Sequence, residues 1–392
     1  MKQYIFIISL IACSFGCQKK LDVKPDKSLV VPSTLKDLQA LLDAASVNSS
    51  CVMIGEAGAD NYYLQDTRWA ALAVQYRNIY VWEKDLYPGI TNIFDWYIPY
   101  EEVFRANVVL EALERYNASM AHTDEYKNIK GTALFIRAHA FYQLAQLFCK
   151  PYSSTAATDL GIPLKLNADV TEPVYSASVQ ETYNRILTDL QTAKGLLPYI
   201  ASYITRPSVN AVYALSARVY LTMGSYDKAL EYSNASLDKN DILLDFNTLS
   251  PGAANPIPVY NNEIVWDSKF TGTGPLGQST APVDTLLYAA YAADDLRKVV
   301  FFKTETNGLI TFKGNYSGST IRWGGIANDE IYLVRAECKA RNGDKDGAMN
   351  DLNFLLQKRW KAGTFAPLTA STADEALGLI LNERRKELLF RG

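Results

Sequence analysis

The chain has 392 residues, a formal net charge of −3 and an aromatic content of 12%, with 25 tyrosines and 6 tryptophans. This length is sufficient for a large hydrophobic core in one compact body or in two merged lobes. The slightly acidic balance gives no electrostatic reason to expect nucleic acid as a partner, since nucleic-acid binding normally needs a clustered basic surface.

The first residues have the pattern of a lipoprotein export signal. The apolar run 4–15 is shorter than the ~20 residues that a permanent membrane-spanning helix needs. We expect residues 1–16 to be removed and Cys17 to carry lipid as the first residue of the mature chain. Cys13 is the alternative lipid acceptor, and an ordinary secretion signal with incidental cysteines is the other interpretation. Residues 17–32 would form an extended tether.

The predicted body, residues 33–392, is mainly helical. Ser33 or Thr34 is positioned to cap a first helix that starts at Leu35. Residues 51–91 lack helical spacing, and we expect loops and short helices there. Apolar residues then recur at steps of three or four and predict long helices over residues 96–116, 125–148 and 179–197.

Two predicted helical hairpins, residues 207–237 and 328–359, share a register. Small residues occupy equivalent positions in both, namely Ala217, Gly224 and Ala229 in the first and Ala336, Gly343 and Ala348 in the second. Small side chains let two helices approach closely, and a glycine makes the tight turn between them. This pattern is typical of tetratricopeptide-like pairs. Two unrelated antiparallel helix pairs are the alternative.

A long irregular stretch, residues 247–325, interrupts the helices. It is rich in Gly, Pro, Asn, Thr and Ser, and such an insertion in a compact protein is usually either functional or disordered. Its apolar and aromatic residues, Trp266 and Trp323 among them, argue for order. The segment 272–277 matches the pattern GxGxxG. Because Pro275 lies inside it and no strong helix follows at once, we expect a loop rather than a phosphate cradle.

The sequence offers little for catalysis. It has 2 histidines, and His139 lies within a predicted long helix, where we expect it to be packed rather than catalytic. GxSxG, HExxH and Walker motifs are absent. Beyond the signal, Cys51, Cys149 and Cys338 are too widely spaced for a zinc site, and we expect no metal and no cofactor. We predict that the protein is not an enzyme; a glycosidase with two distant carboxylates is the least favoured alternative.

Aromatic and polar side chains in the irregular stretches are the candidate ligand-binding residues. Sugar rings have apolar C–H faces that stack on Trp and Tyr, and their hydroxyl groups need amide, carboxylate or carbonyl partners. Loops often carry binding residues. The candidates are Asp60, Asn61, Tyr62, Trp69, Trp82, Trp266 and Trp323. The alternative for each ring is that it only anchors a loop to the helical core.

Several motifs follow one another in a specific order. They include Ala106-Asn107, Gly131-x-Ala133-x-Phe135-Ile136-Arg137-Ala138, Gly161-Ile162-Pro163-Leu164, Glu330-Ile331-Tyr332-Leu333-x-Arg335-Ala336-Glu337 and Asp351-Leu352-Asn353. Each motif alone is modest. In this order and at this spacing, they resemble the SusD/RagB family of outer-membrane nutrient-binding lipoproteins, almost from end to end of the chain.

The resemblance implies a mainly α fold, with a scaffold of tetratricopeptide-like helical hairpins covered on one face by a large irregular, loop-rich region. It implies a lipid-anchored protein on the outward side of the outer membrane of a Gram-negative cell. Such a protein binds oligosaccharides, or less often peptides, and delivers them to a SusC-like TonB-dependent transporter. The alternative is a tetratricopeptide-type scaffold or peptide-binding lipoprotein without sugar specificity.

The end of the sequence departs from the family pattern. Residues 380–390 resemble a late helix of the family, after which the family continues through a basic-aromatic stretch and a further tail. This chain stops at Gly392, and we therefore expect a truncated C-terminus.

Overall fold

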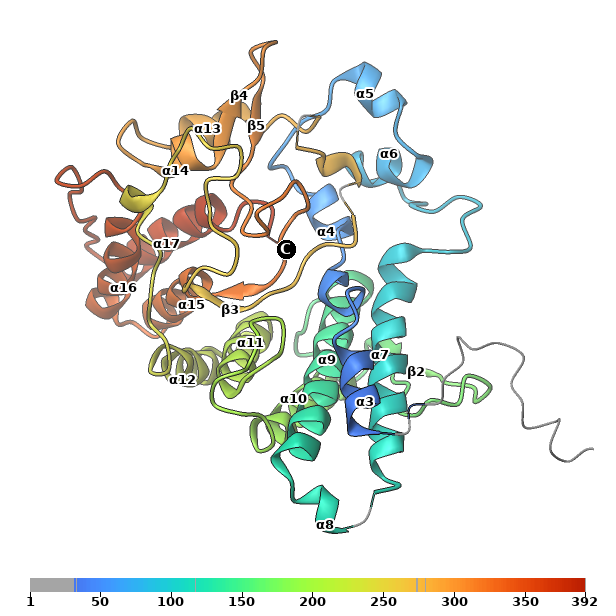
Figure 1. Cartoon of the computed structure of the whole chain (residues 1–392). Coiled ribbons are helices and arrows are strands. Elements are labelled where there is room, and N and C mark those ends of the chain that lie inside the picture. The colour runs from blue at the N-terminus through green and yellow to red at the C-terminus, as the bar shows by residue number, and fades with distance from the viewer. Residues whose placement is uncertain (1–31, 33, 117, 273, 279, 392) are drawn as a thin grey trace, which may run out of the picture.

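The computed structural model describes residues 32, 34–116, 118–272, 274–278 and 280–391 (Figure 1). The predicted signal, both candidate lipid acceptors and nearly all of the tether lie outside these residues. The described chain is mainly helical, with only short strands, as the sequence predicts. None of its helices has the length and apolar character needed to cross a membrane.

The N-terminal half of the scaffold is built around one long helix, α9 (Asp124–Phe148), whose central residues 131–145 are all buried. It packs against α7 (Phe94–Leu113) and α10 (Val179–Lys194), and α3 (Leu35–Leu42) lies on α7 and α9. Thr34, one of the two predicted caps of the first helix, is the N-cap of α3. Its hydroxyl accepts a hydrogen bond from the Asp37 amide, while the Asp37 carboxylate accepts one from the Thr34 amide.

The two predicted helical hairpins are confirmed. The first is α11 (Val209–Thr222) with α12 (Tyr226–Leu237), and the second is α15 (Asn328–Arg341) with α16 (Lys345–Gln357). Helix α17 (Ala373–Glu387) packs on the second hairpin. The turn glycines Gly224 and Gly343 have φ values of +70° and +84°, in the left-handed region that favours glycine. All four matched alanines are fully buried.

Residues 51–91 form loops and short helices, as expected. The helices are α4 (Ile54–Ala57), α5 (Asp66–Ala70) and α6 (Val74–Tyr80). This segment is held by the irregular region, because Cys51 pairs with Phe270 and Tyr62 pairs with Val283 through isolated β-bridges. One hydrophobic cluster therefore joins residues more than two hundred positions apart.

The described residues of the region 247–325 form a series of short elements that lie above the helical hairpins in Figure 1. Its short elements are η3 (Phe246–Thr248), β3 (Ile264–Trp266), η4 (Gly274–Leu276), α13 (Thr285–Ala289), α14 (Arg297–Val300), β4 (Phe302–Thr304) and β5 (Ile310–Phe312). Strand β3 pairs with β6 (Ile326–Ala327), which leads directly into α15, and β4 pairs with β5. In the described residues of the GxGxxG segment the only regular element is the single 3₁₀ turn η4, in agreement with the predicted loop.

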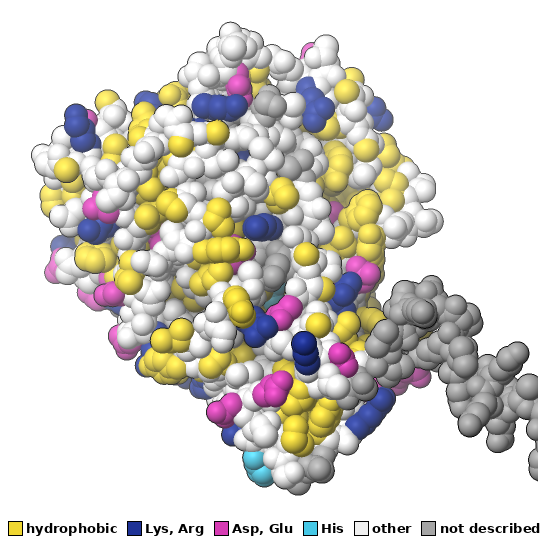
Figure 2. Space-filling model, in the orientation of Figure 1, with side chains coloured by type: hydrophobic (Ala, Val, Ile, Leu, Met, Phe, Trp, Pro, Cys, Tyr) yellow, Lys and Arg dark blue, Asp and Glu magenta, His cyan; other side chains and the backbone are white. Residues whose placement is uncertain are grey.

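Two short strands, one 3₁₀ turn and one short helix make up the other described elements. A small hairpin pairs β1 (Leu160–Pro163) with β2 (Ser176–Ser178) between α9 and α10. The short elements η2 (Val47–Ser49) and α8 (Ala118–Ala121) complete the fold. Figure 2 shows positive and negative side chains interspersed over the visible face, without a large patch of one sign.

Candidate functional site

Two of the predicted ligand-binding tryptophans are core residues. Trp266 and Trp323 have only 2% and 1% of their surface exposed, so neither presents a face to a ligand. The Trp266 indole donates a hydrogen bond to the Thr205 carbonyl at 3.1 Å. The Trp323 indole donates to Asp267 at 2.7 Å, and its ring stacks on Tyr316. Both polar tips are satisfied inside the protein, so the expectation of a surface role is wrong for these two residues.

Tyr62 and Trp69 are also largely engaged by the fold. Tyr62 is 4% exposed, and its hydroxyl donates to the Ala57 carbonyl at 2.7 Å, so the expectation of an accessible ring is wrong here too. Trp69 is half-buried. Its indole donates to the Arg77 carbonyl at 3.3 Å, and the Arg77 guanidinium lies over its ring. The loop-anchoring alternative therefore describes both rings.

Trp82 differs from the other candidates, because 79% of its surface is exposed. Its indole N–H donates to the Gly58 carbonyl at 2.9 Å, which fixes the ring orientation. Its φ of +55° lies in the left-handed region, where a bulky residue costs of order 1–3 kcal/mol. The fold thus holds an exposed indole in a strained backbone conformation, which is a pattern associated with functional positions.

Two of the predicted polar residues lie close in sequence to Gly58, whose carbonyl accepts the hydrogen bond from Trp82. Asp60 and Asn61 follow Gly58 closely, and both are bound by Arg385 from α17. The Arg385 Nε donates to Asn61 Oδ1 at 3.0 Å, and one Nη donates to Asp60 Oδ1 at 3.2 Å. We call Gly58, Asp60, Asn61, Trp82 and Arg385 the Trp82 platform. It combines a flat apolar face with amide, carboxylate and guanidinium groups.

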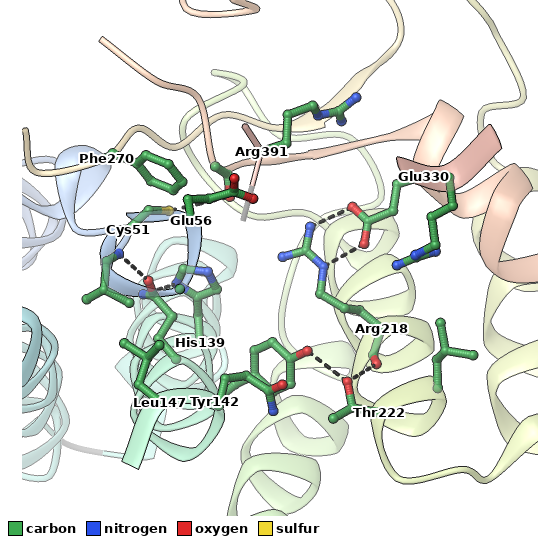
Figure 3. Close-up of a pocket in the computed structure, with 17 residues that line it drawn as sticks. Cys51, Glu56, His139, Tyr142, Leu147, Arg218, Thr222, Phe270, Glu330 and Arg391 are labelled. Carbon is green, nitrogen blue, oxygen red and sulfur yellow. Dashed lines mark hydrogen bonds and ion pairs between the residues drawn. The ribbon is translucent and has the colours of Figure 1, made fainter. Parts of the chain in front are cut away.

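A pocket of about 470 Å³ lies between the N-terminal half of the scaffold and the helical hairpins (Figure 3). Its lining comes from α4, α9, α11, α15 and the C-terminal segment, and includes Glu56, His139, Tyr142, Arg218, Glu330 and Arg391. Figure 3 shows Arg218 and Glu330 facing each other, with hydrogen bonds of 2.7 and 2.6 Å between them. Arg391 is bound by Asp329. Arg218, Glu330 and Arg391 are thus already paired within the protein.

Burial shifts the pKa values of two titratable side chains in this pocket, His139 and Cys51. Burial lowers the pKa of His139 to about 3, and the nearby charge of Arg218 adds to this effect. Burial raises the pKa of the Cys51 thiol to about 11. At neutral pH the imidazole is therefore uncharged and the thiol is protonated, so neither is prepared as a general acid or a nucleophile. The predicted packing of His139 is confirmed, since its ring lies against Trp266.

A buried carboxylate cluster lies beneath the irregular region. Oxygen atoms of Glu263, Asp329 and Glu387 come within 4.8 Å of one another, a spacing that a metal ion could use. Arg359, however, donates to both Glu263 and Glu387 at 2.6 Å, and Arg391 donates to Asp329 at 3.1 Å. Guanidinium groups already supply the compensating positive charge. We therefore interpret the cluster as an internal ion-pair network.

Comparison with protein families agrees with this architecture. Residues 19–221 match the SusD-like family model described as "Starch-binding associating with outer membrane", and residues 315–392 match the model of the SusD family. The first match alone covers more than half of the chain. The chain belongs to the SusD/RagB family.

Individual relatives give the same result. SusD-like protein P2 of Formosa agariphila is 25% identical over 340 residues, which cover 70% of this chain and 65% of the relative. The chain thus spans just under two-thirds of this relative's length. A SusD superfamily protein of Bacteroides thetaiotaomicron has a TM-score of 0.75 at 20% identity, covering 92% of this chain and 87% of its own. A SusD-like carbohydrate binding protein of Bacteroides vulgatus has a TM-score of 0.69 at 21% identity, covering 92% and 82%.

These structural matches establish that the chain has the SusD fold. The sequence predicts three members of the Trp82 platform, Asp60, Asn61 and Trp82, but not Arg385. The only signal for that residue is the pair Arg384-Arg385 in the late helix motif, and nothing in its spacing shows which element it contacts.

Proposed function

We propose that this SusD-family protein is a cell-surface lipoprotein that binds oligosaccharide nutrients on the Trp82 platform and delivers them to a SusC-like TonB-dependent transporter in the outer membrane. The description of the matching family model supports two parts of this proposal, the binding of a glycan and the association with the outer membrane. The name of the Bacteroides vulgatus structure, a carbohydrate binding protein, points in the same direction.

The observation that carries the binding proposal is the exposed, fixed indole of Trp82. Stacking of a sugar ring on an aromatic face needs a ring that is both accessible and already oriented, because ordering a mobile side chain costs free energy. Trp82 satisfies both conditions through its exposure and its hydrogen bond to Gly58. Asp60 and Asn61 supply partners for sugar hydroxyl groups, and Arg385 holds them in place.

The direct test is calorimetric titration of the purified protein with a panel of neutral and acidic oligosaccharides. Trp82→Ala should weaken binding by tenfold or more, about the value of one aromatic contact. Tyr175→Ala is the matched control, because Tyr175 is 85% exposed but lies on the β1–β2 hairpin. Binding that is equally strong in both variants would contradict the role of the platform. A folded wild-type protein that binds no oligosaccharide would contradict the function.

A further inference from the structure

A second cleft, of about 720 Å³, lies between α16 and the loop 361–367. Figure 1 places α16 on the opposite side of the view from α6, the helix that precedes Trp82. The cleft shares no lining residue with the Trp82 platform. It is lined by Asp245, Asn247, Asn350, Asn353, Phe354, Gln357, Lys358, Lys361, Ala362, Gly363, Phe365 and Pro367.

Two asparagines fix the walls of this cleft. Asn247 accepts a hydrogen bond from the Ala362 amide at 2.9 Å and donates to the Trp360 carbonyl at 2.9 Å. Asn353 donates to the Leu368 carbonyl at 2.9 Å and accepts from the Leu368 amide at 2.8 Å. The loop is thus held at both ends. A site with walls that are already ordered loses less entropy when a ligand binds.

The rest of the lining combines aromatic rings with amide side chains that make no hydrogen bond to other described residues. Phe354 is 44% exposed, and its ring packs on Tyr332 with centroids 5.3 Å apart. Asn350 and Gln357 lie on the same face of α16 as Phe354, at helical spacings of four and three residues. In the part of the chain that the structure describes, neither amide side chain makes a hydrogen bond. Phe365, across the cleft, packs on Trp360.

We propose that the α16 cleft is a second oligosaccharide-binding site, an inference that rests on the proposed glycan-binding function. Phenyl faces suit the C–H faces of sugars, and the free amides of Asn350 and Gln357 suit their hydroxyl groups. A helical peptide would instead need a continuous apolar groove. The ionic groups Asp245 and Lys358 lie 3.6 Å apart and compensate each other, whereas Lys361 has no ion-pair partner among the described residues. The lining thus offers a ligand aromatic faces, neutral amides and one ammonium group, all of which suit sugar rings and their hydroxyl groups.

The test combines calorimetry with hydrogen–deuterium exchange. The probes are malto-, cello- and xylohexaose, each titrated into wild type, Trp82→Ala and Phe354→Ala. We expect Trp82→Ala to keep a second binding event, with slower amide exchange in residues 361–367. Phe354→Ala should weaken that event by about tenfold and remove the protection. The double variant Asn350→Ala/Gln357→Ala tests the same cleft with less risk of misfolding. Both side chains are exposed, and neither makes an internal hydrogen bond among the described residues.

The possible outcomes distinguish failure of the α16 cleft from failure of the Trp82 platform. If Trp82→Ala abolishes all binding and residues 361–367 are never protected, the protein binds glycans but the α16 cleft does not. If the Phe354 and double variants lose binding while Trp82→Ala does not, the cleft is supported and the platform is rejected. If folded wild type binds none of the hexaoses and none of the wider oligosaccharide panel, both proposals fail. Ile200→Ala, an exposed change outside both sites, should leave every measurement unchanged.

Discussion

At the scale of single residues, buried arginines tie the irregular region to the C-terminal helix. Arg359 follows α16, and it donates to Glu263 of the irregular region and to Glu387 of α17, both at 2.6 Å. All three side chains are almost completely buried. A buried charge that loses its partner is costly, because it can neither be solvated nor easily neutralised.

Removing this arginine should therefore destabilise the protein strongly. We expect Arg359→Met to lower the free energy of unfolding by about 3–5 kcal/mol, measured by urea denaturation. The control is Arg206→Met, which breaks a pair with Asp43 whose side chains are 30% and 34% exposed, and it should cost less than ~1 kcal/mol. Similar small losses in both variants would show that the buried network is not important for stability.

The same network predicts a pH dependence. Burial raises the pKa of Glu263 to about 7, and the charges of Asp329 and Glu387 add to this rise while Arg359 opposes it. Burial also opposes ionisation of Glu387, but the charges of Arg359 and Arg297 outweigh it and lower the pKa to about 2. Burial also raises the pKa of Asp329, so Glu263 and Asp329, but not Glu387, are the members of the cluster that we expect to take up protons.

A group whose pKa is higher in the folded than in the unfolded protein stabilises the folded protein when it is protonated. This stabilisation is fully present at pH values below the pKa of the unfolded state. For Glu263 this contribution is lost as the pH rises from its ordinary value of 4.5 through about 7. The free energy of unfolding should therefore fall by about 1–3 kcal/mol between roughly pH 5 and 8, and it should fall less in Glu263→Gln. Glu231→Gln, on the exposed face of α12, should keep the wild-type slope. Identical slopes in all three proteins would rule out this role.

Which tryptophans face solvent could not be predicted from the sequence. Trp82, Trp266 and Trp323 all lie in irregular stretches, where no periodicity separates an inner face from an outer one. Burial of the last two depends on hydrogen-bond partners elsewhere in the chain, Thr205 and Asp267. Exposure of Trp82 depends on a left-handed backbone conformation, which has no reliable signal in the sequence around a tryptophan.

At the scale of elements, the helical hairpins were far more predictable. The predicted hairpins over 207–237 and 328–359 correspond to α11–α12 (209–237) and α15–α16 (328–357), with ends that differ by two residues at most. Both turns contain the expected glycine. This success has a physical origin, because helical spacing, small residues at a close contact and a turn glycine are all local features of the sequence.

The turn glycine offers a test at this scale. Gly343 has φ +84°, and no atom lies within 4 Å of the position that a β-carbon would take, so Gly343→Ala should cost about 1–2 kcal/mol through backbone strain alone. Gly378 lies within α17, also without such neighbours but in ordinary helical conformation. Gly378→Ala should instead stabilise the protein by about 0.8–1 kcal/mol. Thermal unfolding measures both changes, and shifts of the same sign would contradict the explanation.

At the scale of the whole molecule, the proposed function depends on attachment to the outer membrane. We expect Cys17→Ser to abolish incorporation of radiolabelled palmitate and to shift the protein out of the outer-membrane fraction, because the tether would lose its lipid. Cys13→Ser should leave labelling and fractionation unchanged. The reverse result would assign the lipid to Cys13, and the absence of any label in wild type would contradict the anchor.

The bridge between Cys51 and the irregular region has a consequence for biogenesis. The Cys51 thiol meets the Ser268 hydroxyl across 217 positions of sequence, and the surrounding cluster contains residues up to Phe390. Synthesis from the N-terminus therefore produces residues 51–72 of this cluster long before the larger part, residues 246–390, exists. Contacts of such long range form slowly and leave apolar surface exposed in the meantime. A nascent chain of this protein should thus depend on chaperone protection until α17 and Phe390 have emerged.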